Sequence, residues 1–271
     1  MSSGLGLHAP IGAPVDASAY DHYIGRWSRL FVPAVLSAAE IGAGDRILDV
    51  ATGSGEAALL AVAAVGDSGL VIGADISSAM LEAARVRLSG RPFRAVVTDG
   101  QILAFRDASF DAVVCQLGLM FFPDPERGLT EFRRVLRRGR CAAVCVISSS
   151  SRAPMWGILA EALSRYIPDQ ATTLQLSFSL AQPARLERIF AGAGFRDVRV
   201  GAEIREAFVE SFDEYWAPIE AGTGQMPQMY LALPETSRRA VRDEVQARLA
   251  KFESSGRLRM RVEMLVASGR A

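Results

Sequence analysis

The sequence predicts an α/β fold in which helices cover both faces of a mostly parallel, doubly wound sheet. Short runs of apolar and β-branched residues recur along the first half of the chain, and helical patterns separate them. Most of these runs are apolar on both faces, which is typical of parallel strands buried between helices. The regular alternation of strand and helix favours right-handed crossovers within one sheet.

The first half of the chain contains the core elements of this predicted sheet. We expect strands at 46–50, 69–75, 93–98, 110–116 and 141–148. Helices are predicted at 55–65, 77–88 and 125–137, with Ser77 or Ser78 as an N-cap of the second. Before the first strand, the aromatic-rich segment 20–39 is predicted as one helix that ends at the glycines near 42–44.

The last third of the chain changes character. A helix is predicted at 183–193, alternating strands at 195–204 and 258–266, and a mostly helical insertion at 211–255. The two strands would complete the sheet, with an antiparallel strand at its edge. We expect a leader at 1–18 and one domain over 19–271, which consists of a helical cap (19–44), a cofactor-binding core (45–148), substrate-side helical segments (149–182 and 208–256) and a last strand (257–271).

Composition excludes several classes of function. Lys and Arg number 30 and balance 30 Asp and Glu, so no nucleic-acid partner is expected. No apolar run approaches the ~20 residues of a membrane span, and the N-terminus has no signal-peptide pattern, so we expect a cytoplasmic protein. Cys115, Cys141 and Cys145 fall in predicted strands without metal or disulfide spacing, so we expect no metal.

The most informative segment is ILDVATGSG at 47–55, a buried strand that enters a helix through a turn of small residues. In α/β proteins such a turn brings backbone N–H groups against a nucleotide-like ligand. Gly53 and Gly55 suit positions where the chain turns sharply or where a side chain would block the ligand. Alone, the pattern does not identify the ligand.

Three aspartates lie at or just past the ends of successive predicted strands: Asp49, Asp75 and Asp99. In a parallel sheet these strand ends share one edge, where such folds bind ligands. Asp75 has the place of the acidic residue that binds ribose hydroxyls. A single aspartate there is as often a helix cap or turn residue, but three together favour a binding site.

Charge favours one nucleotide-like ligand over the others. The turn has no GKS or GKT, which a P-loop requires, although Ala58 in the third glycine position is compatible with NAD. Asp49 and Glu56 make the turn acidic, which disfavours a pyrophosphate and favours a cation. S-adenosylmethionine carries both an amino group and a sulfonium, and we therefore expect it as the cofactor.

On these motifs the chain resembles the class I S-adenosylmethionine-dependent methyltransferases, which have a Rossmann-like sheet. Within them it is most similar to the branch that includes the ubiquinone and menaquinone C-methyltransferases. The matching segments are LDVATGSG (48–55), GADISSAML (73–81), TDGQILAFRDASFDAVVCQLGLMFF (98–122) and PERGLTEFRRVLRRGR (125–140). The chain departs from the family at Ala51, where a glycine is usual, and at Met120 to Phe122, where many relatives carry histidines.

The resemblance implies a site for S-adenosylmethionine and its product S-adenosylhomocysteine. Asp49 and the turn would hold the methionine part, Asp75 the ribose, and Asp99 the adenine amino group. The full set that the resemblance implies is Tyr23, Trp27, Asp49, Ala51, Thr52, Gly53, Gly55, Asp75, Ile76, Met80, Asp99, Gly100, Gln101, Gln116 and Leu117. For Trp27 and Met80 a purely structural role in core packing is an equal alternative.

The expected reaction is methyl transfer to carbon or oxygen of a small, largely hydrophobic acceptor, such as a quinol, a phenol or a natural product. The acceptor pocket is predicted to contain Met120, Phe121, Trp156, Trp216 and Met229. Positioning alone can supply ~7–11 kcal/mol to such a displacement. A base is therefore optional; His22 or Tyr23 is the candidate, and a helix-packing role is the alternative for His22.

Two other classes of function stay open at this point. The same sheet could belong to an NAD(P)-dependent oxidoreductase, although the acidic turn argues against it. The chain could also be a methyltransferase-like protein that binds the cofactor without catalysis. We expect a monomer or a homodimer.

Overall fold

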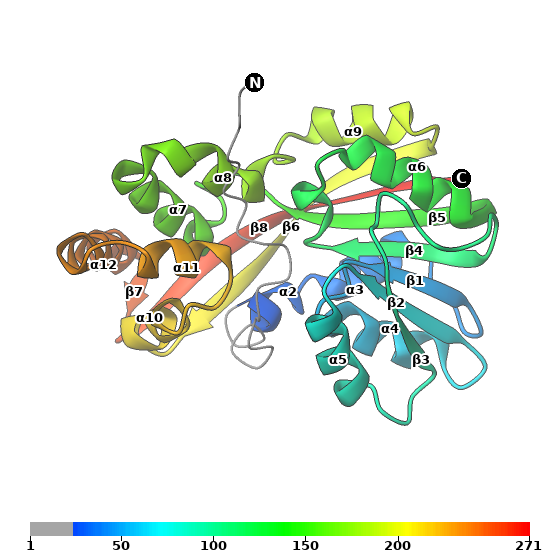
Figure 1. Ribbon diagram of the computed structural model, residues 1–271, viewed down its shortest axis with the longest axis horizontal. Coiled ribbons are helices and arrows are strands. Elements are labelled where there is room, and N and C mark those ends of the chain that lie inside the picture. Colours follow the sequence, from blue (N-terminus) through cyan, green and yellow to red (C-terminus); the bar gives the residue numbers. More distant parts are fainter. Residues whose placement is uncertain (1–23) are drawn as a thin grey trace, which may run out of the picture.

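The computed structural model describes residues 24–271 and has at its centre one eight-stranded sheet with helices on both faces (Figure 1). The strand order is β3-β2-β1-β4-β5-β8-β6, and the short β7 pairs with β8. β1 to β5 are parallel, whereas β8 runs antiparallel to β5, β6 and β7. The strands are β1 Arg46–Val50, β2 Leu70–Asp75, β3 Phe93–Val97, β4 Phe110–Gln116, β5 Leu136–Ile147, β6 Arg196–Val209, β7 Glu253–Ser254 and β8 Arg257–Arg270. The predicted fold class is confirmed.

Helices follow the strands as the sequence pattern predicts. In Figure 1, α6 and α9 lie above the sheet, and α3, α4 and α5 lie below it. Ser77 caps α5 by accepting a hydrogen bond from the Met80 N–H, and Asp124 caps α6 by accepting one from Arg127. These helices are α3 Val32–Ala38, α4 Glu56–Val65, α5 Ser78–Arg87, α6 Pro125–Val135 and α9 Pro183–Gly192.

β6 and β8 extend beyond the other strands and carry a second lobe, on the left of Figure 1. The lobe is held together by buried aromatic rings: Trp216 stacks on Phe212 and meets Tyr230 edge-on, and the Tyr215 hydroxyl donates to the Met155 carbonyl at 2.6 Å. Its α-helices are α7 Pro154–Tyr166, α8 Ala171–Gln175, α10 Phe212–Glu220, α11 Gln225–Leu231 and α12 Glu235–Leu249. Short 3-10 turns complete the chain at η2 Leu119–Phe121, η3 Pro168–Gln170, η4 Leu176–Phe178 and η5 Ala250–Phe252.

The structure corrects some predicted boundaries. The single helix predicted at 20–39 is wrong within the described residues, because a turn at 29–31 separates α2, Arg26–Ser28, from α3. Pro33 has no N–H to continue the hydrogen-bond ladder there. The strands β5, β6 and β8 are also longer than predicted, since charged residues hid their exposed ends.

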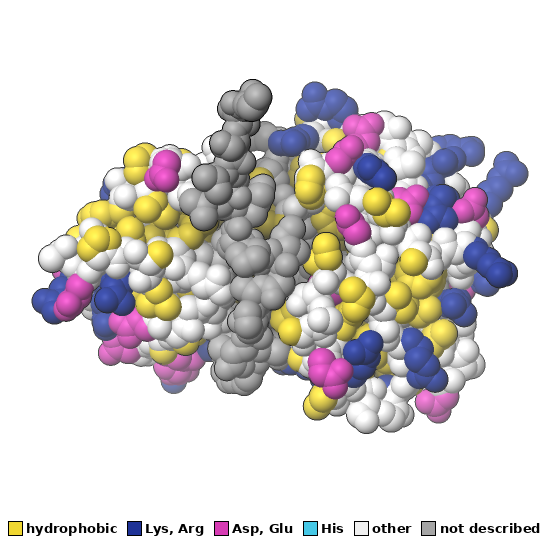
Figure 2. All heavy atoms as spheres, in the orientation of Figure 1, with side chains coloured by type: hydrophobic (Ala, Val, Ile, Leu, Met, Phe, Trp, Pro, Cys, Tyr) yellow, Lys and Arg dark blue, Asp and Glu magenta, His cyan; other side chains and the backbone are white. Residues whose placement is uncertain are grey.

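The surface agrees with the balanced composition. Figure 2 shows basic and acidic side chains interspersed over the visible face of the molecule. Among the helices of residues 24–271, none combines the length and the apolar composition that crossing a membrane requires.

Candidate functional site

The turn between β1 and α4 is built from residues in the left-handed backbone region. Gly53 has φ 54° and Gly55 has φ 88°. A Cβ on Gly55 would lie 3.1 Å from the Leu88 side chain and 3.3 Å from that of Ala84. Glycine is therefore required at this position both by conformation and by space, and the turn presents bare backbone at the sheet edge.

Asp49, at the end of β1, is fully buried behind this turn. Its Oδ2 accepts a hydrogen bond from the Thr52 hydroxyl at 2.6 Å, but its Oδ1 has no hydrogen-bond partner among the described residues. Burial raises the pKa of Asp49 to about 7, and the nearby charge of Asp75 also raises it, whereas the Thr52 hydrogen bond and the nearby backbone amide of Ala58 oppose the rise. A buried carboxylate oxygen without a partner is costly, and it indicates a missing donor.

Gln116, at the end of β4, leaves a second buried acceptor unpaired near the same turn. Its Nε2 donates to the Ser28 carbonyl at 3.1 Å, while its Oε1 has no hydrogen-bond partner in the part of the chain that the structure describes. Gln116 lines a small cavity together with Ala51, Thr52 and Gly53. Two unpaired acceptors at this turn suit a ligand group that donates several hydrogen bonds, such as an ammonium.

Asp75, at the end of β2, is fixed by the backbone on both oxygens. The Gly53 amide donates to Oδ2 at 2.9 Å, and the Ser77 amide donates to Oδ1 at 2.9 Å. Burial raises the pKa of Asp75, and these amides oppose the rise. Each oxygen retains a lone pair, so the carboxylate can still accept hydrogen bonds from a ligand. Of the apolar neighbours, Ile76 is half exposed, and the buried Met80 methyl packs below Gly53.

Beyond β3, Asp99, Gly100 and Gln101 form a turn at the third strand end. Asp99 accepts a hydrogen bond from the Gln101 amide at 2.8 Å, and the Gln101 side chain accepts one from the Asp124 amide at 2.8 Å. A side chain on Gly100 would collide with Phe122. Since β1, β2 and β3 are adjacent and parallel, the structure brings Asp49, Asp75 and Asp99 to one edge, as predicted.

Glu56 does not add negative charge to the turn, so the prediction that it makes the turn acidic is wrong. It is 6% exposed and forms ion pairs with Arg29, which precedes it in the sequence, and with Arg87, which follows it. The hydrogen bonds from Arg29 to the two Glu56 oxygens measure 2.7 and 2.9 Å. The negative charge available to a ligand therefore comes from Asp49 and Asp75.

Ala51 occupies the position where the family usually has glycine, and it keeps the left-handed conformation with φ 56°. Leu117, across the edge, is also left-handed, with φ 54°. A Cβ on Gly118 would lie less than 3.0 Å from the Ala51 Cβ. Gly118 thus makes room for the alanine, a role that no signal in the sequence indicated. Strained non-glycine residues of this kind concentrate at functional sites.

The predicted acceptor-side residues are dispersed between core and surface. Trp156 and Trp216 are 2% and 1% exposed and belong to the core of the second lobe. Met120 is also buried, Met229 is half-buried and Phe121 is 45% exposed. Trp27 is 8% exposed, with the Arg26 guanidinium 4.1 Å from its ring centre.

His22 and Tyr23, the candidate bases, lie outside the described residues. Within residues 24–271, no group of His, Cys, Asp or Glu is arranged to hold a metal ion. Cys115, Cys141 and Cys145 are buried thiols.

The sheet order and the turn after β1 define the class of the protein as a Rossmann-like α/β nucleotide-binding fold. Residues 48–143 match the family model described as a methyltransferase domain. The ubiquinone/menaquinone biosynthesis C-methyltransferase UbiE of Xanthomonas oryzae is 38% identical over 126 residues, which cover 45% of this chain and 48% of that protein. The chain thus spans about half the length of the curated relatives it matches.

Solved structures with low sequence identity share the fold. The phosphoethanolamine N-methyltransferase 2 of Haemonchus contortus has a TM-score of 0.58 at 16% identity, covering 94% of this chain and 57% of that protein. The arsenic(III) S-adenosylmethionine methyltransferase CrArsM of Chlamydomonas reinhardtii has a TM-score of 0.51 at 20% identity, covering 89% and 73%. The similarity in sequence to methyltransferases thus rests on residues 48–143, which match the methyltransferase domain family.

Proposed function

We propose that this protein transfers the methyl group of S-adenosylmethionine to a small, largely apolar acceptor. The observation that carries the proposal is the pair of unpaired buried acceptors beside the glycine turn, Asp49 Oδ1 and Gln116 Oε1. An ammonium would donate to both, and Asp49 would balance its charge. A dinucleotide would place a pyrophosphate at this turn, where the buried carboxylate would repel it.

The residues at the sheet edge suit the parts of this cofactor in order along four adjacent strands, β4, β1, β2 and β3. Asp49, Gln116 and the turn around Gly53 would hold the amino acid end, Asp75 the ribose hydroxyls, and the Asp99 turn the adenine. When bound, S-adenosylmethionine supplies an electrophilic methyl group. The protein's own part is to orient the two reactants and to exclude water.

For the acceptor, support comes from the relatives and from the composition of the second lobe. The UbiE proteins are named as ubiquinone/menaquinone C-methyltransferases, and a quinol or phenol carbon is accordingly the acceptor class that we favour. Phe121 and Met229 retain surface that an apolar ring could contact, and His22 or Tyr23 could take the acceptor proton. Under this proposal 19–271 act as one domain, with the 19–44 cap and the second lobe enclosing the acceptor.

Calorimetric titration with S-adenosylhomocysteine, S-adenosylmethionine and NADH tests the cofactor assignment. We expect the first two to bind and Asp49→Asn to lose most of that affinity. Asp67→Asn, an exposed aspartate in the turn after α4, is the matched control and should bind as the wild type does. Binding of NADH alone would contradict the proposal.

Catalysis is tested separately from binding. Incubation with labelled S-adenosylmethionine and a panel of quinols, phenols and polyketides should transfer label to an apolar acceptor. Tight cofactor binding without transfer to any member of a broad panel would favour the non-catalytic alternative.

A further inference from the structure

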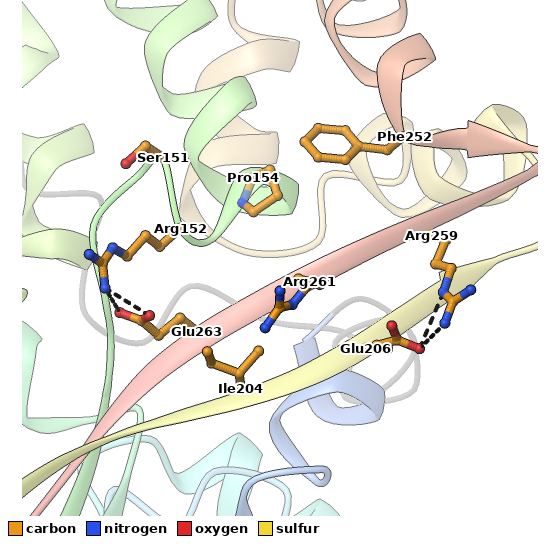
Figure 3. Close-up of a pocket in the computed structure, with 9 residues that line it drawn as sticks. All are labelled: Ser151, Arg152, Pro154, Ile204, Glu206, Phe252, Arg259, Arg261 and Glu263. Carbon is orange, nitrogen blue, oxygen red and sulfur yellow. Dashed lines mark hydrogen bonds and ion pairs between the residues drawn. The ribbon is translucent and has the colours of Figure 1, made fainter.

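A second hollow lies away from the sheet edge, against the extended part of β6 and β8. It measures about 590 Å³, within the range of small-molecule sites. Figure 3 shows the residues that line it, which come from the loop after β5, from the start of α7, from both strands and from η5: Ser151, Arg152, Pro154, Ile204, Glu206, Phe252, Arg259, Arg261 and Glu263. We refer to this set as the arginine groove.

Strand register places the arginine groove on the opposite face of β6 from the elements that border the glycine turn. Ile204 and Glu206 pair with Glu263 and Arg261, so these four side chains share one face. Arg205, between them, points to the other face and donates to the Leu30 carbonyl between α2 and α3 at 3.3 Å. The groove is therefore separate from the cofactor site.

Two ion pairs stiffen the walls of the groove. Arg152 donates to both oxygens of Glu263 at 2.9 Å, and the Glu263 amide donates to the Arg152 carbonyl at 2.9 Å. On the other side, Arg259 pairs with Glu206 at 2.6 Å. These contacts hold both arginines in place before any ligand arrives, which reduces the entropy that binding would cost.

Arg261 lies between the two pairs in Figure 3, and among the described residues its guanidinium has neither an ion pair nor a hydrogen bond. With three arginines against two glutamates, the groove carries one net positive charge. Beside this charge, Ile204 is 41% exposed and Phe252 is half-buried, so the wall next to Arg261 is apolar.

We propose that the arginine groove is a second ligand site, which binds a small organic acid with one carboxylate on a short apolar body. A guanidinium matches the two oxygens of a carboxylate in a bidentate pair. The single net charge fits a monoanion, because Glu206 and Glu263 would repel the second charge of a phosphate. The apolar wall favours an organic body over an inorganic ion. This inference does not depend on the proposed reaction.

Titration calorimetry in Tris buffer with hexanoate, acetate, hexylamine and inorganic phosphate tests the proposal. We expect saturable binding of hexanoate, weaker binding of acetate and none of hexylamine. Arg261→Gln should weaken hexanoate roughly ten- to a hundredfold, the range for a hydrogen bond to a charged group. Arg257→Gln is the control, since Arg257 is exposed on the same strand and pairs with Glu210 outside the groove.

A further variant separates the apolar part of the site from the charge. Ile204→Ala should weaken hexanoate but leave acetate unchanged. The Arg261 guanidinium has no partner within residues 24–271 to lose, so Arg261→Gln should keep the melting temperature of the wild type. The proposal is overturned if hexanoate does not bind, if phosphate binds as tightly as hexanoate, or if Arg261→Gln binds hexanoate as the wild type does.

Discussion

The buried carboxylate of Asp49 should destabilise the ligand-free protein, and Asp49→Asn should therefore raise its stability while removing cofactor binding. Burial raises the pKa of Asp49 from its usual 3.8 to about 7. A folded-state pKa above the unfolded one means that the contribution of this group is most favourable below pH 4. That contribution is lost as pH rises through 7.

The size of the effect follows from this shift. A rise of this extent corresponds to about 4 kcal/mol of unfolding free energy at pH 8, because each pKa unit is worth about 1.4 kcal/mol. Asparagine avoids the charge and still accepts the Thr52 hydrogen bond, but its NH₂ group would replace one unpaired acceptor with an unpaired donor. Allowing ~1–3 kcal/mol for that loss, we expect a net gain of about 1–3 kcal/mol at pH 8. At pH 4, where the charge contributes only about 0.5 kcal/mol, the same loss should leave Asp49→Asn less stable than the wild type by about 0.5–2.5 kcal/mol.

Urea unfolding of both proteins at pH 4 and pH 8, with and without S-adenosylhomocysteine, measures the effect. At a hundredfold excess over the dissociation constant, the ligand should stabilise the wild type by about 2.7 kcal/mol and leave Asp49→Asn unchanged. The reasoning would be refuted if Asp49→Asn were less stable than the wild type at pH 8 without ligand, or if the ligand stabilised both proteins equally.

Three further outcomes follow from the same site. Gly118→Ala should lower the free energy of unfolding by about 1–3 kcal/mol through overpacking. The loss should be smaller in an Ala51→Gly background, where the Cys115 sulfur, 2.9 Å from the new Cβ, still crowds it. Thermal unfolding of the four proteins would show this, and equal losses would contradict the contact. Arg29→Ala should lower the free energy of unfolding by about 1–3 kcal/mol, because the buried charge of Glu56 loses one of its partners. The same substitution in a Glu56→Gln background should lower it clearly less in the same assay. Finally, the affinity for S-adenosylhomocysteine should rise with pH between 5.5 and 7, by up to about tenfold per unit, as Asp49 ionises; a flat calorimetric profile would argue that Asp49 does not hold the amino group.

The parallel half of the sheet could be predicted because its signals are local. Each of β1 to β4 is a short apolar run, and the parallel arrangement alone brings their carboxyl ends together. Asp49, Asp75 and Asp99 were therefore found from the sequence pattern. Their positions depend only on where each strand ends.

Features that depend on contacts between distant segments could not be predicted. Arg29 reaches Glu56 from 27 residues away and cancels its charge, so the sequence made the turn look more acidic than it is. Gly118 accommodates Ala51 from the end of another strand, and nothing in its own neighbourhood indicates this role. The length of β6 and β8 was likewise hidden, because their outer faces carry charged rather than apolar residues.

This division between local and distant contacts also separates the two halves of the proposed function. The cofactor side is formed by strand ends and turns within the parallel sheet, where the backbone fixes Asp75 and the glycine turn. The acceptor side depends on helices that the long β6 and β8 carry, and its aromatic core joins α10 to α7 through the Tyr215–Met155 hydrogen bond. Substitutions on the surface of that lobe, such as Met229→Ala, should consequently change which acceptor is methylated without changing the affinity for the cofactor. A loss of cofactor affinity in such a variant would mean that the two halves are coupled.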